Sequence, residues 1–326
     1  MATDARSLPS LPASGPDSVY CTVFYCEPEF SALAEAELHA LVGGRVAEPG
    51  VWLSPAPVRW AETSFARTGG RQLASGATLD ALEEAVSSLD LAARTFHIEP
   101  VRVPRRSKGA TLACSRIADC IDGDVDVDAP DVRFELVVSE VGLRLLIATE
   151  LDAGDPSWLA TSRKPHPYMV GLPVRIANAM IHLTARPGDS LLDPFCGSGT
   201  IPLLAAFAGL RAYGSDRSAT WVERAGENIA HFGKHATLAC VDARQTEQRA
   251  DCIVTNLPYG RYSHLETDAL VEVLRRIGRL APRVTMVTSE RIERELGEAG
   301  FRIESVLSVE PRRFERFVYV TRAPLG

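Results

Sequence analysis

The residues best able to do chemistry begin with a glycine turn. The segment LLDPFCGSGT, residues 191–200, is typical of a strand that runs into a turn and opens a helix. Because Gly197 and Gly199 have no side chains, the backbone can approach a ligand closely at the carboxyl end of a parallel strand, where open α/β sheets bind cofactors. A dinucleotide fingerprint would need Gly or Ala in place of Pro202, and a P-loop would need Gly-Lys-Ser/Thr. The turn is therefore not typical of a pyrophosphate site.

Acidic residues end the strands expected next to this turn. Asp216 follows Asp193 by 23 residues, where a carboxylate can accept both ribose hydroxyls of a nucleoside. Asp242 ends the third expected strand, where it can accept from an adenine amino group while the N–H of Ala243 donates to the ring. Each Asp alone is typical of a helix cap or a solvated turn. The series predicts a nucleoside ligand that lies across the sheet without a pyrophosphate.

The fourth expected strand ends in the sequence NLPYG, residues 256–260. An exocyclic amine on a purine is a poor nucleophile, so modifying it requires acceptors that hold its N–H bonds and orient the nitrogen. The side-chain oxygen of Asn256 and the carbonyl of Leu257 or Pro258 can be these acceptors. Tyr259 offers a face on which an extruded base can stack. The motif therefore indicates chemistry on a base amine.

Together these motifs resemble a known family. DPFCGSGT followed by NLPYG resembles the class I S-adenosylmethionine-dependent methyltransferases that modify exocyclic amines through an (N/D)-P-P-Y type motif. Over the whole chain, the order of segments resembles the THUMP-domain tRNA guanine-N2 methyltransferases, including PEF at 28–30, AEAEL at 34–38 and VRV at 101–103. The resemblance implies an α/β fold class: a C-terminal Rossmann-like, seven-stranded methyltransferase domain behind an N-terminal α+β ferredoxin-like and THUMP module.

The resemblance also implies the site residues and the reaction. It assigns binding of the cofactor S-adenosyl-L-methionine to Asp193, Cys196, Gly197, Gly199, Thr200, Asp216, Asp242 and Ala243. It assigns the target base to Asn256, Pro258 and Tyr259. The implied reaction is direct methyl transfer to the N2 amine of a guanosine in tRNA. Three alternatives stay open: guanine N2 in ribosomal RNA, adenine N6 in nucleic acid, and a catalytically silent RNA-binding module.

One stretch departs from the family pattern. The family usually has a Leu-(His/Lys)-Arg-Arg-like stretch just before the helix that enters the catalytic domain, and here residues 159–167 read LATSRKPHP. The sequence therefore leaves open how this linker touches the cofactor or RNA.

Hydrophobic periodicity predicts the scaffold that must position these motifs. Seven strands are expected in the catalytic domain, with a helix between each successive pair of the first six and a final hairpin, which implies a doubly wound sheet. The expected strands are residues 190–192, 212–215, 237–241, 252–255, 285–288, 303–308 and 317–321. The expected domains are a disordered tail (1–18), a ferredoxin-like segment (19–64), a THUMP-like RNA-binding domain (65–150), a Pro- and Gly-containing linker (151–172) and the methyltransferase domain (173–326).

Charge is distributed unevenly along the chain. The formal net charge of −7 would disfavour a polyanionic partner. However, residues 1–160 carry 13 Lys/Arg against 24 Asp/Glu, whereas residues 161–326 carry 22 against 18. Residues 119–131 hold six Asp and no base, and residues 101–116 hold five bases and no acid. A solvated face is one interpretation of the basic run, and tRNA contact through Arg102, Arg105, Arg106 and Lys108 is the other.

Other features exclude several classes. Seven cysteines without a CxxC pair, and no secretory signal, predict reduced thiols in a cytoplasmic protein. No metal site is expected, and a nucleophilic role for Cys196 is disfavoured because no Cys follows the NLPY motif. The longest apolar stretch, residues 201–210, is about half of what a bilayer requires, so no membrane partner is expected. We expect a monomer.

Overall fold

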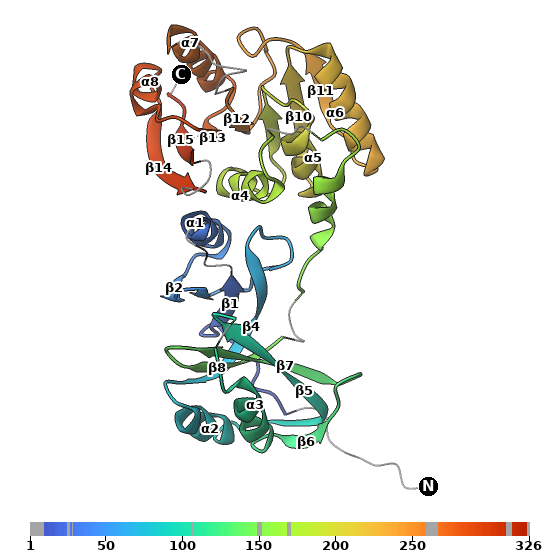
Figure 1. Cartoon of the computed structure of the whole chain (residues 1–326), viewed down its shortest axis with the longest axis vertical. Coiled ribbons are helices and arrows are strands. Elements are labelled where there is room, and N and C mark those ends of the chain that lie inside the picture. The colour runs from blue at the N-terminus through green and yellow to red at the C-terminus, as the bar shows by residue number, and fades with distance from the viewer. Residues whose placement is uncertain are drawn as a thin grey trace. The chain divides into compact units, whose positions relative to one another are not determined.

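The computed structural model in Figure 1 consists of two compact units. It describes residues 10–24, 27, 29–105, 107–148, 152–167, 171–258, 267–310 and 315–324. The N-terminal unit comprises Met1–Cys26, Val42–Ala61 and Phe65–Gly154. The C-terminal unit comprises Glu27–Leu41, Glu62–Ser64 and Asp155–Gly326.

The N-terminal unit is an eight-stranded sheet with the strand order β2-β3-β1-β4-β8-β7-β5-β6. Its strands are β1 (Tyr20–Phe24), β2 (Arg45–Glu48), β3 (Val51–Ser54), β4 (Ala66–Gly76), β5 (Ala92–Val103), β6 (Asp122–Val125), β7 (Val132–Ser139) and β8 (Leu143–Ile147). Its helices are α2 (Leu79–Ser87) and α3 (Ala110–Ala118). Strands β7 and β8 form an antiparallel hairpin.

Alternation along β7 divides its side chains between the two faces of the sheet. Phe134, Leu136 and Val138 are buried in one cluster with residues of α2 and α3. Val137 is buried in a second cluster with Leu146 and residues of β1 and β3. The period of two along the strand places successive residues on opposite faces, so both faces of this sheet carry a core.

The acidic run of the N-terminal unit contributes a strand at the edge of its sheet. Asp122–Val125, within that run, form the edge strand β6, in which every residue is exposed. Ser10 lies in the segment expected to be a disordered tail, but it pairs with Ala92 at the start of β5. Its N–H donates to the Ala92 carbonyl at 2.9 Å, and its carbonyl accepts from the Ala92 N–H at 3.2 Å.

The C-terminal unit is built on a seven-stranded sheet with the order β11-β10-β9-β12-β13-β15-β14. Its strands are β9 (Ser190–Asp193), β10 (Arg211–Asp216), β11 (Thr237–Cys240), β12 (Cys252–Asn256), β13 (Arg283–Thr288), β14 (Arg302–Val309) and β15 (Arg316–Arg322). Its helices are α1 (Ser31–Val42, whose last residue falls in the other unit), the 3-10 helix η1 (Pro156–Arg163), α4 (Val174–Thr184), α5 (Thr200–Phe207), α6 (Ala219–His231), α7 (Thr267–Gly278) and α8 (Glu293–Glu298).

The pairing of these strands confirms the predicted doubly wound sheet. Strands β10, β9, β12 and β13 are parallel neighbours, and β15 pairs antiparallel with both β13 and β14. The central strands are near-continuous hydrophobic runs because both faces are covered by helices, as Figure 1 shows. With the α+β unit before it, this architecture confirms the predicted fold class.

One expected helix is absent from this unit. The sequence prediction placed a helix between each successive pair of the first six strands, but residues 241–251, between β11 and β12, form a turn and an irregular segment. The carbonyl of Asp242 accepts from the N–H of Gln245 at 2.8 Å and of Thr246 at 3.1 Å, and no longer helix follows. The segment VDARQTEQRAD lacks the apolar residues at helical spacing that would let a helix pack on the sheet.

The segment expected to be ferredoxin-like is divided between the two units. Its helix α1 belongs to the C-terminal unit, where the carboxylate of Glu37 is fully buried. This carboxylate accepts from the Ser64 N–H at 2.9 Å and from the Ser64 hydroxyl at 2.7 Å, and it lies 2.7 Å from Nδ1 of His182 on α4. These polar contacts fix α1 against α4 because a buried carboxylate without partners would be costly.

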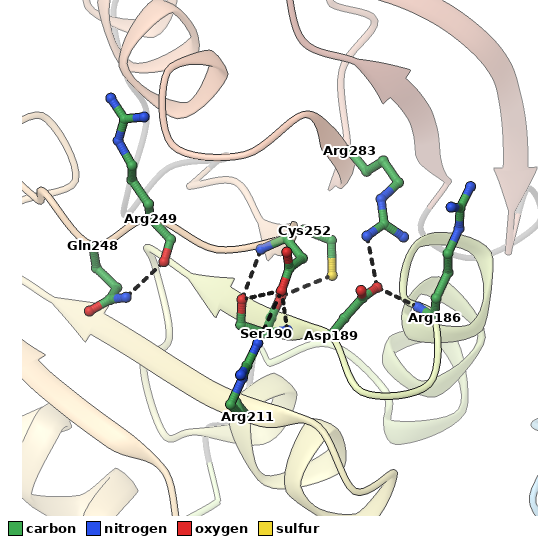
Figure 2. A network of polar contacts seen from close by, with 9 residues as sticks. Arg186, Asp189, Ser190, Arg211, Gln248, Arg249, Cys252 and Arg283 are labelled. Atoms are coloured by element: carbon green, nitrogen blue, oxygen red, sulfur yellow. Dashed lines mark hydrogen bonds and ion pairs between the residues drawn. The ribbon is translucent and has the colours of Figure 1, made fainter.

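The amino-terminal ends of the parallel strands are tied together by the network in Figure 2. The carboxylate of Asp251 accepts from the backbone and the hydroxyl of Ser190, at 2.8 and 2.6 Å, and from Arg211 at 3.4 Å. Arg283 donates to Asp189 at 2.8 Å. The network aligns the starts of β9, β10, β12 and β13, so that their carboxyl ends meet at the opposite edge of the sheet.

Candidate functional site

The strand ends singled out from the sequence come together in the structure. Asp193, Asp216 and Asn256 are the last residues of β9, β10 and β12. These three strands are adjacent and parallel in the sheet, so their carboxyl ends share one edge. This edge is where doubly wound folds bind ligands, beside the point at which the strand order reverses.

Asp193 is a deeply buried carboxylate. Its side-chain oxygen Oδ1 accepts from the hydroxyl of Thr255 at 2.7 Å and from the backbone N–H of Phe195 at 3.0 Å. Burial raises the pKa of Asp193 to about 7, against the lowering effect of these two hydrogen bonds, and the nearby charge of Asp216 raises it further. No cation pairs with this carboxylate among the residues that the structure describes, so the site holds a charge without a counter-charge.

The glycine turn is held in place by the carboxylate of Asp216. Its Oδ2 accepts from the Gly197 N–H at 3.0 Å and its Oδ1 from the Ser218 N–H at 2.9 Å. The Cys196 N–H donates to the Ser215 carbonyl at 2.9 Å. Each carboxylate oxygen keeps a further lone pair, so Asp216 can hold the turn and still accept ligand hydroxyls.

Gly199 is required by its backbone and by its neighbour. It adopts φ +78° as the N-cap of α5, and a Cβ placed there would lie 2.9 Å from the Cβ of Ala225 on α6. Only glycine allows α6 to approach the turn this closely without strain. At Gly197, also at positive φ, a Cβ would meet nothing within 4 Å, so the space beside the turn is open.

Cys196 lies in the turn but does not have the properties of a nucleophile. Its side chain is buried, and burial raises its pKa, with the charges of Asp193 and Asp216 adding to the effect. A thiol that stays protonated is unreactive. A raised pKa disfavours a nucleophilic role for Cys196, and its place in cofactor binding stays a prediction.

Asp242 and Ala243 differ from their predicted placement at a strand end. Strand β11 ends at Cys240, and Asp242 lies in the turn that follows. Both carboxylate oxygens of Asp242 accept from the guanidinium of Arg244, each at 2.9 Å. This pairing and the Arg244 N–H lower the pKa of Asp242 to about 2. The sequence analysis did not identify Arg244 as the partner of Asp242. The signal was available, because an Arg two residues after an Asp can form a local ion pair with it.

Asn256 has an unsatisfied acceptor. Its Oδ1 is buried and has no hydrogen-bond partner among the described residues. The next residue is fixed, because the Leu257 N–H donates to the Val287 carbonyl at 3.0 Å. An unpaired buried amide oxygen is costly, and at the ligand-binding edge of the sheet it is suited to accept from an incoming N–H. Pro258 follows directly, and Tyr259 lies outside the described residues.

Lys164 was not predicted as a site residue, yet it touches the predicted cofactor turn. Its ammonium donates to the hydroxyl of Thr200, the first residue of α5, and the lysine is 8% exposed. Burial lowers the pKa of Lys164 to about 8. The only signal in the sequence was that residues 159–167 depart from the family pattern. That departure did not single out Lys164.

The predicted RNA contacts lie in the N-terminal unit. Arg102 near the end of β5, and Arg105 and Lys108 before α3, are exposed. Arg106 lies outside the described residues. The three described cations are within seven residues of one another at one end of β5, so they form a local basic patch, which we call the β5 patch.

Two expected absences concern metals and membranes. Across the residues that the structure describes, no cluster of three or more His, Cys, Asp or Glu side chains is arranged to hold a metal ion. Within the same residues, no helix has both the length and the hydropathy needed to span a bilayer.

Comparison with known proteins shows what the C-terminal part of the chain is similar to. Residues 163–292 match the protein-family model described as "RMKL-like, methyltransferase domain", a range that contains all three strand ends. This part of the chain is therefore similar to the methyltransferase domains of that family, in agreement with the resemblance of its motifs. The solved structure of TrmN from Thermus thermophilus, at 23% identity and a TM-score of 0.50, covers 94% of this chain and 99% of that chain and shows the same fold.

Curated relatives match a shorter part of the chain. A tRNA (guanine(10)-N2)-dimethyltransferase of Methanothermobacter thermautotrophicus is 35% identical over 102 residues, which is 30% of each chain. The protein of the same name from Pyrococcus abyssi is 35% identical over 112 residues, 32% of this chain and 34% of the relative. A U6 snRNA (guanine-N(2))-methyltransferase, THUMPD2 of Bos taurus, is 30% identical over 142 residues, 40% of this chain and 28% of the relative. The chain thus spans about a third of the length of these relatives.

Proposed function

We propose that this protein transfers a methyl group from S-adenosyl-L-methionine to the exocyclic N2 amine of a guanosine in tRNA. The observation that carries the proposal is the unpaired, buried Oδ1 of Asn256 at the strand edge that also holds Asp193 and Asp216. A methyltransferase domain needs a methyl donor and an acceptor atom at one edge, and this edge offers residues for both.

The residues at this edge fit the proposed cofactor. The turn at Gly197 and Gly199 presents backbone without side chains, and Asp216 keeps lone pairs for two ribose hydroxyls. Asp193 is a buried carboxylate that pairs with no cation among the described residues, which suits the ammonium of an amino acid. Asp242 and Ala243 would contact the adenine, with Asp242 shared between Arg244 and the base amine. S-adenosyl-L-methionine, when bound, supplies a methyl carbon made electrophilic by the attached sulfonium.

Asn256 would orient the target amine. Its Oδ1 accepts one N–H of the base, and a carbonyl of Leu257 or Pro258 accepts the other, which turns the nitrogen lone pair toward the methyl donor. Such positioning replaces chemical activation of the amine, since no general base is needed to deprotonate it before attack. Tyr259 would stack on the extruded base.

The choice of guanine N2 and of tRNA comes from the relatives. The proteins from the two archaea are named for guanine N2 in tRNA, and the bovine protein for guanine N2 in a small nuclear RNA. The names agree on the amine and differ in the RNA, so the amine is the better supported half of the proposal. The β5 patch of Arg102, Arg105 and Lys108 would contact the RNA backbone, because phosphate contacts position an RNA without reading its sequence.

The test is to incubate the purified protein with isotopically labelled S-adenosyl-L-methionine and unmodified tRNA, and to identify the nucleoside by mass spectrometry. We expect N2-methylguanosine from the wild-type protein. Asn256→Ala should lower turnover by about 100-fold or more, the scale of losing one positioned polar group in an active site, while leaving cofactor affinity unchanged. Labelled N6-methyladenosine would overturn the guanine assignment, and cofactor binding without any labelled nucleoside would overturn the activity.

A further inference from the structure

Lys164 carries a buried positive charge that no acid of the described part of the chain neutralises. The lysine is 8% exposed, and its ammonium donates to the Thr200 hydroxyl. An ammonium has three N–H donors, and no carboxylate among the described residues pairs with it. Retaining an unpaired cation in the interior is costly, so its presence beside a ligand-binding turn requires an explanation.

The structure fixes this lysine against the turn through the residues that follow it. Asn228 on α6 is fully buried and bonds to both sides: its Nδ2 donates to the carbonyls of His166 and of Ser198, at 3.0 and 2.9 Å. Its Oδ1 accepts from the His166 N–H at 2.8 Å. One side chain therefore joins the linker, two residues after Lys164, to the middle of the glycine turn.

Access to Lys164 restricts the anion that it could meet. Lys164 is 8% exposed as a residue, so it offers little surface to the phosphates of a folded RNA, whose bulk would remain outside. A small carboxylate that lies within the turn could reach it. That carboxylate would also lie at the amino-terminal end of α5, where unpaired backbone N–H groups and the helix dipole favour negative charge.

We propose that Lys164 binds the carboxylate of the methionine portion of the cofactor, at the start of α5 beside Thr200, an inference that rests on the proposed function. Neither Lys164 nor Asp193 forms an ion pair with a described residue. The two buried charges are of opposite sign, and the amino-acid end of the cofactor carries one ammonium and one carboxylate. Asp193 and Lys164 thus complement the two halves of a zwitterion.

The experiment compares two ligands and two variants by calorimetry. S-adenosylhomocysteine carries the amino-acid end, and 5′-methylthioadenosine is the same adenosine thioether without it. Lys164→Met keeps the apolar stem of the side chain and removes the charge. Lys234→Met, which removes a partly exposed lysine lying 4.4 Å from the ring centroid of Phe207, controls for net charge.

For Lys164→Met we expect the Kd of S-adenosylhomocysteine to rise about 10- to 100-fold, the loss of one charge-assisted hydrogen bond. The Kd of 5′-methylthioadenosine should stay the same, and Lys234→Met should change neither. The unfolding midpoint of ligand-free Lys164→Met should be unchanged or raised, whereas a lysine with a merely structural role would lower it.

Two results would overturn the assignment while leaving the proposed function in place. One is equal weakening of both ligands, which would mean that Lys164 shapes the pocket without meeting the carboxylate, and the other is no weakening of S-adenosylhomocysteine. Failure of the wild-type protein to bind either ligand would instead overturn the proposed function, and the carboxylate assignment with it.

Discussion

Neutralising Asp193 should stabilise the ligand-free protein at neutral pH. Asp193→Asn keeps Oδ1 as the acceptor for the Thr255 hydroxyl and the Phe195 N–H, so the hydrogen bonds survive and only the buried charge disappears. A charge that burial disfavours lowers the free energy of unfolding. Comparing Asp193→Asn with the wild-type protein therefore measures the free-energy cost of burying this charge.

The size and the pH window of the effect follow from the pKa. The pKa of Asp193 rises from 3.8 to about 7 on folding, and at 1.36 kcal/mol for each pKa unit this difference amounts to about 4 kcal/mol. Because the folded state holds the proton more tightly, the wild-type protein binds more protons when folded between about pH 4 and pH 7. Its free energy of unfolding therefore falls as the pH rises through that window.

The assay is unfolding in urea at pH 4.5 and at pH 8, with hydrogen exchange of peptides from β9 and β12 to report on the C-terminal unit. At pH 8 we expect Asp193→Asn to exceed the wild-type free energy of unfolding by about 2 to 4 kcal/mol, and at pH 4.5 by less than about 1 kcal/mol. The difference between the two pH values identifies the charge as the cause.

Asp242→Asn is the matched control. Arg244 lowers the pKa of Asp242 to about 2, so this charge is stabilising, and its removal should give no gain at pH 8. The reasoning is refuted if Asp193→Asn brings no stabilisation at pH 8, or if its effect is the same at both pH values.

Two further predictions concern the scaffold of the site, each measured as the free energy of unfolding. Gly199→Ala should lower the free energy of unfolding by about 2 to 4 kcal/mol, because the strain of a positive φ adds to the clash of a Cβ 2.9 Å from the Cβ of Ala225. Gly209→Ala is the control: at φ +74° with open space around the Cβ, it should cost only about 1 to 2 kcal/mol. Equal losses in the two variants would contradict the packing argument. Arg283→Met should cost about 3 kcal/mol by breaking a mostly buried ion pair at the start of β13. Arg211→Met, at an exposed pair, should cost less than about 1 kcal/mol, and the opposite ranking would show that burial does not set the cost.

The fold of the C-terminal unit was largely predictable from the sequence. All seven strands of the C-terminal sheet were predicted, because each is a short apolar run bounded by turn residues, and Asp193, Asp216 and Asn256 stand directly after such runs. A helix between β11 and β12 was wrongly predicted because strands and helices alternate in the rest of this unit. The segment itself has no helical periodicity.

The N-terminal half was less readable. Strands β2 and β3 have four residues each, too few to show an alternation, and β4 contains the pair Gly69-Gly70 and polar residues at partly buried positions. The assignment of α1 to the C-terminal unit depends on the pairing of Glu37 with Ser64 and His182, which are 27 and 145 residues away along the chain. No local pattern reports a contact at such separations.

The sequence by itself placed Asp193, Asp216 and Asn256 at the ends of strands, because strand ends are local, whereas it placed Asp242 at the end of a strand that stops at Cys240. It determined the glycine turn and the NLPY motif for the same reason. Only the tertiary structure decided the charge state of the site. The raised pKa of Asp193, the unpaired Oδ1 of Asn256 and the burial of Lys164 against Thr200 all depend on what surrounds each group in space. Desolvation is a property of the packed environment, and the sequence of a segment does not contain it.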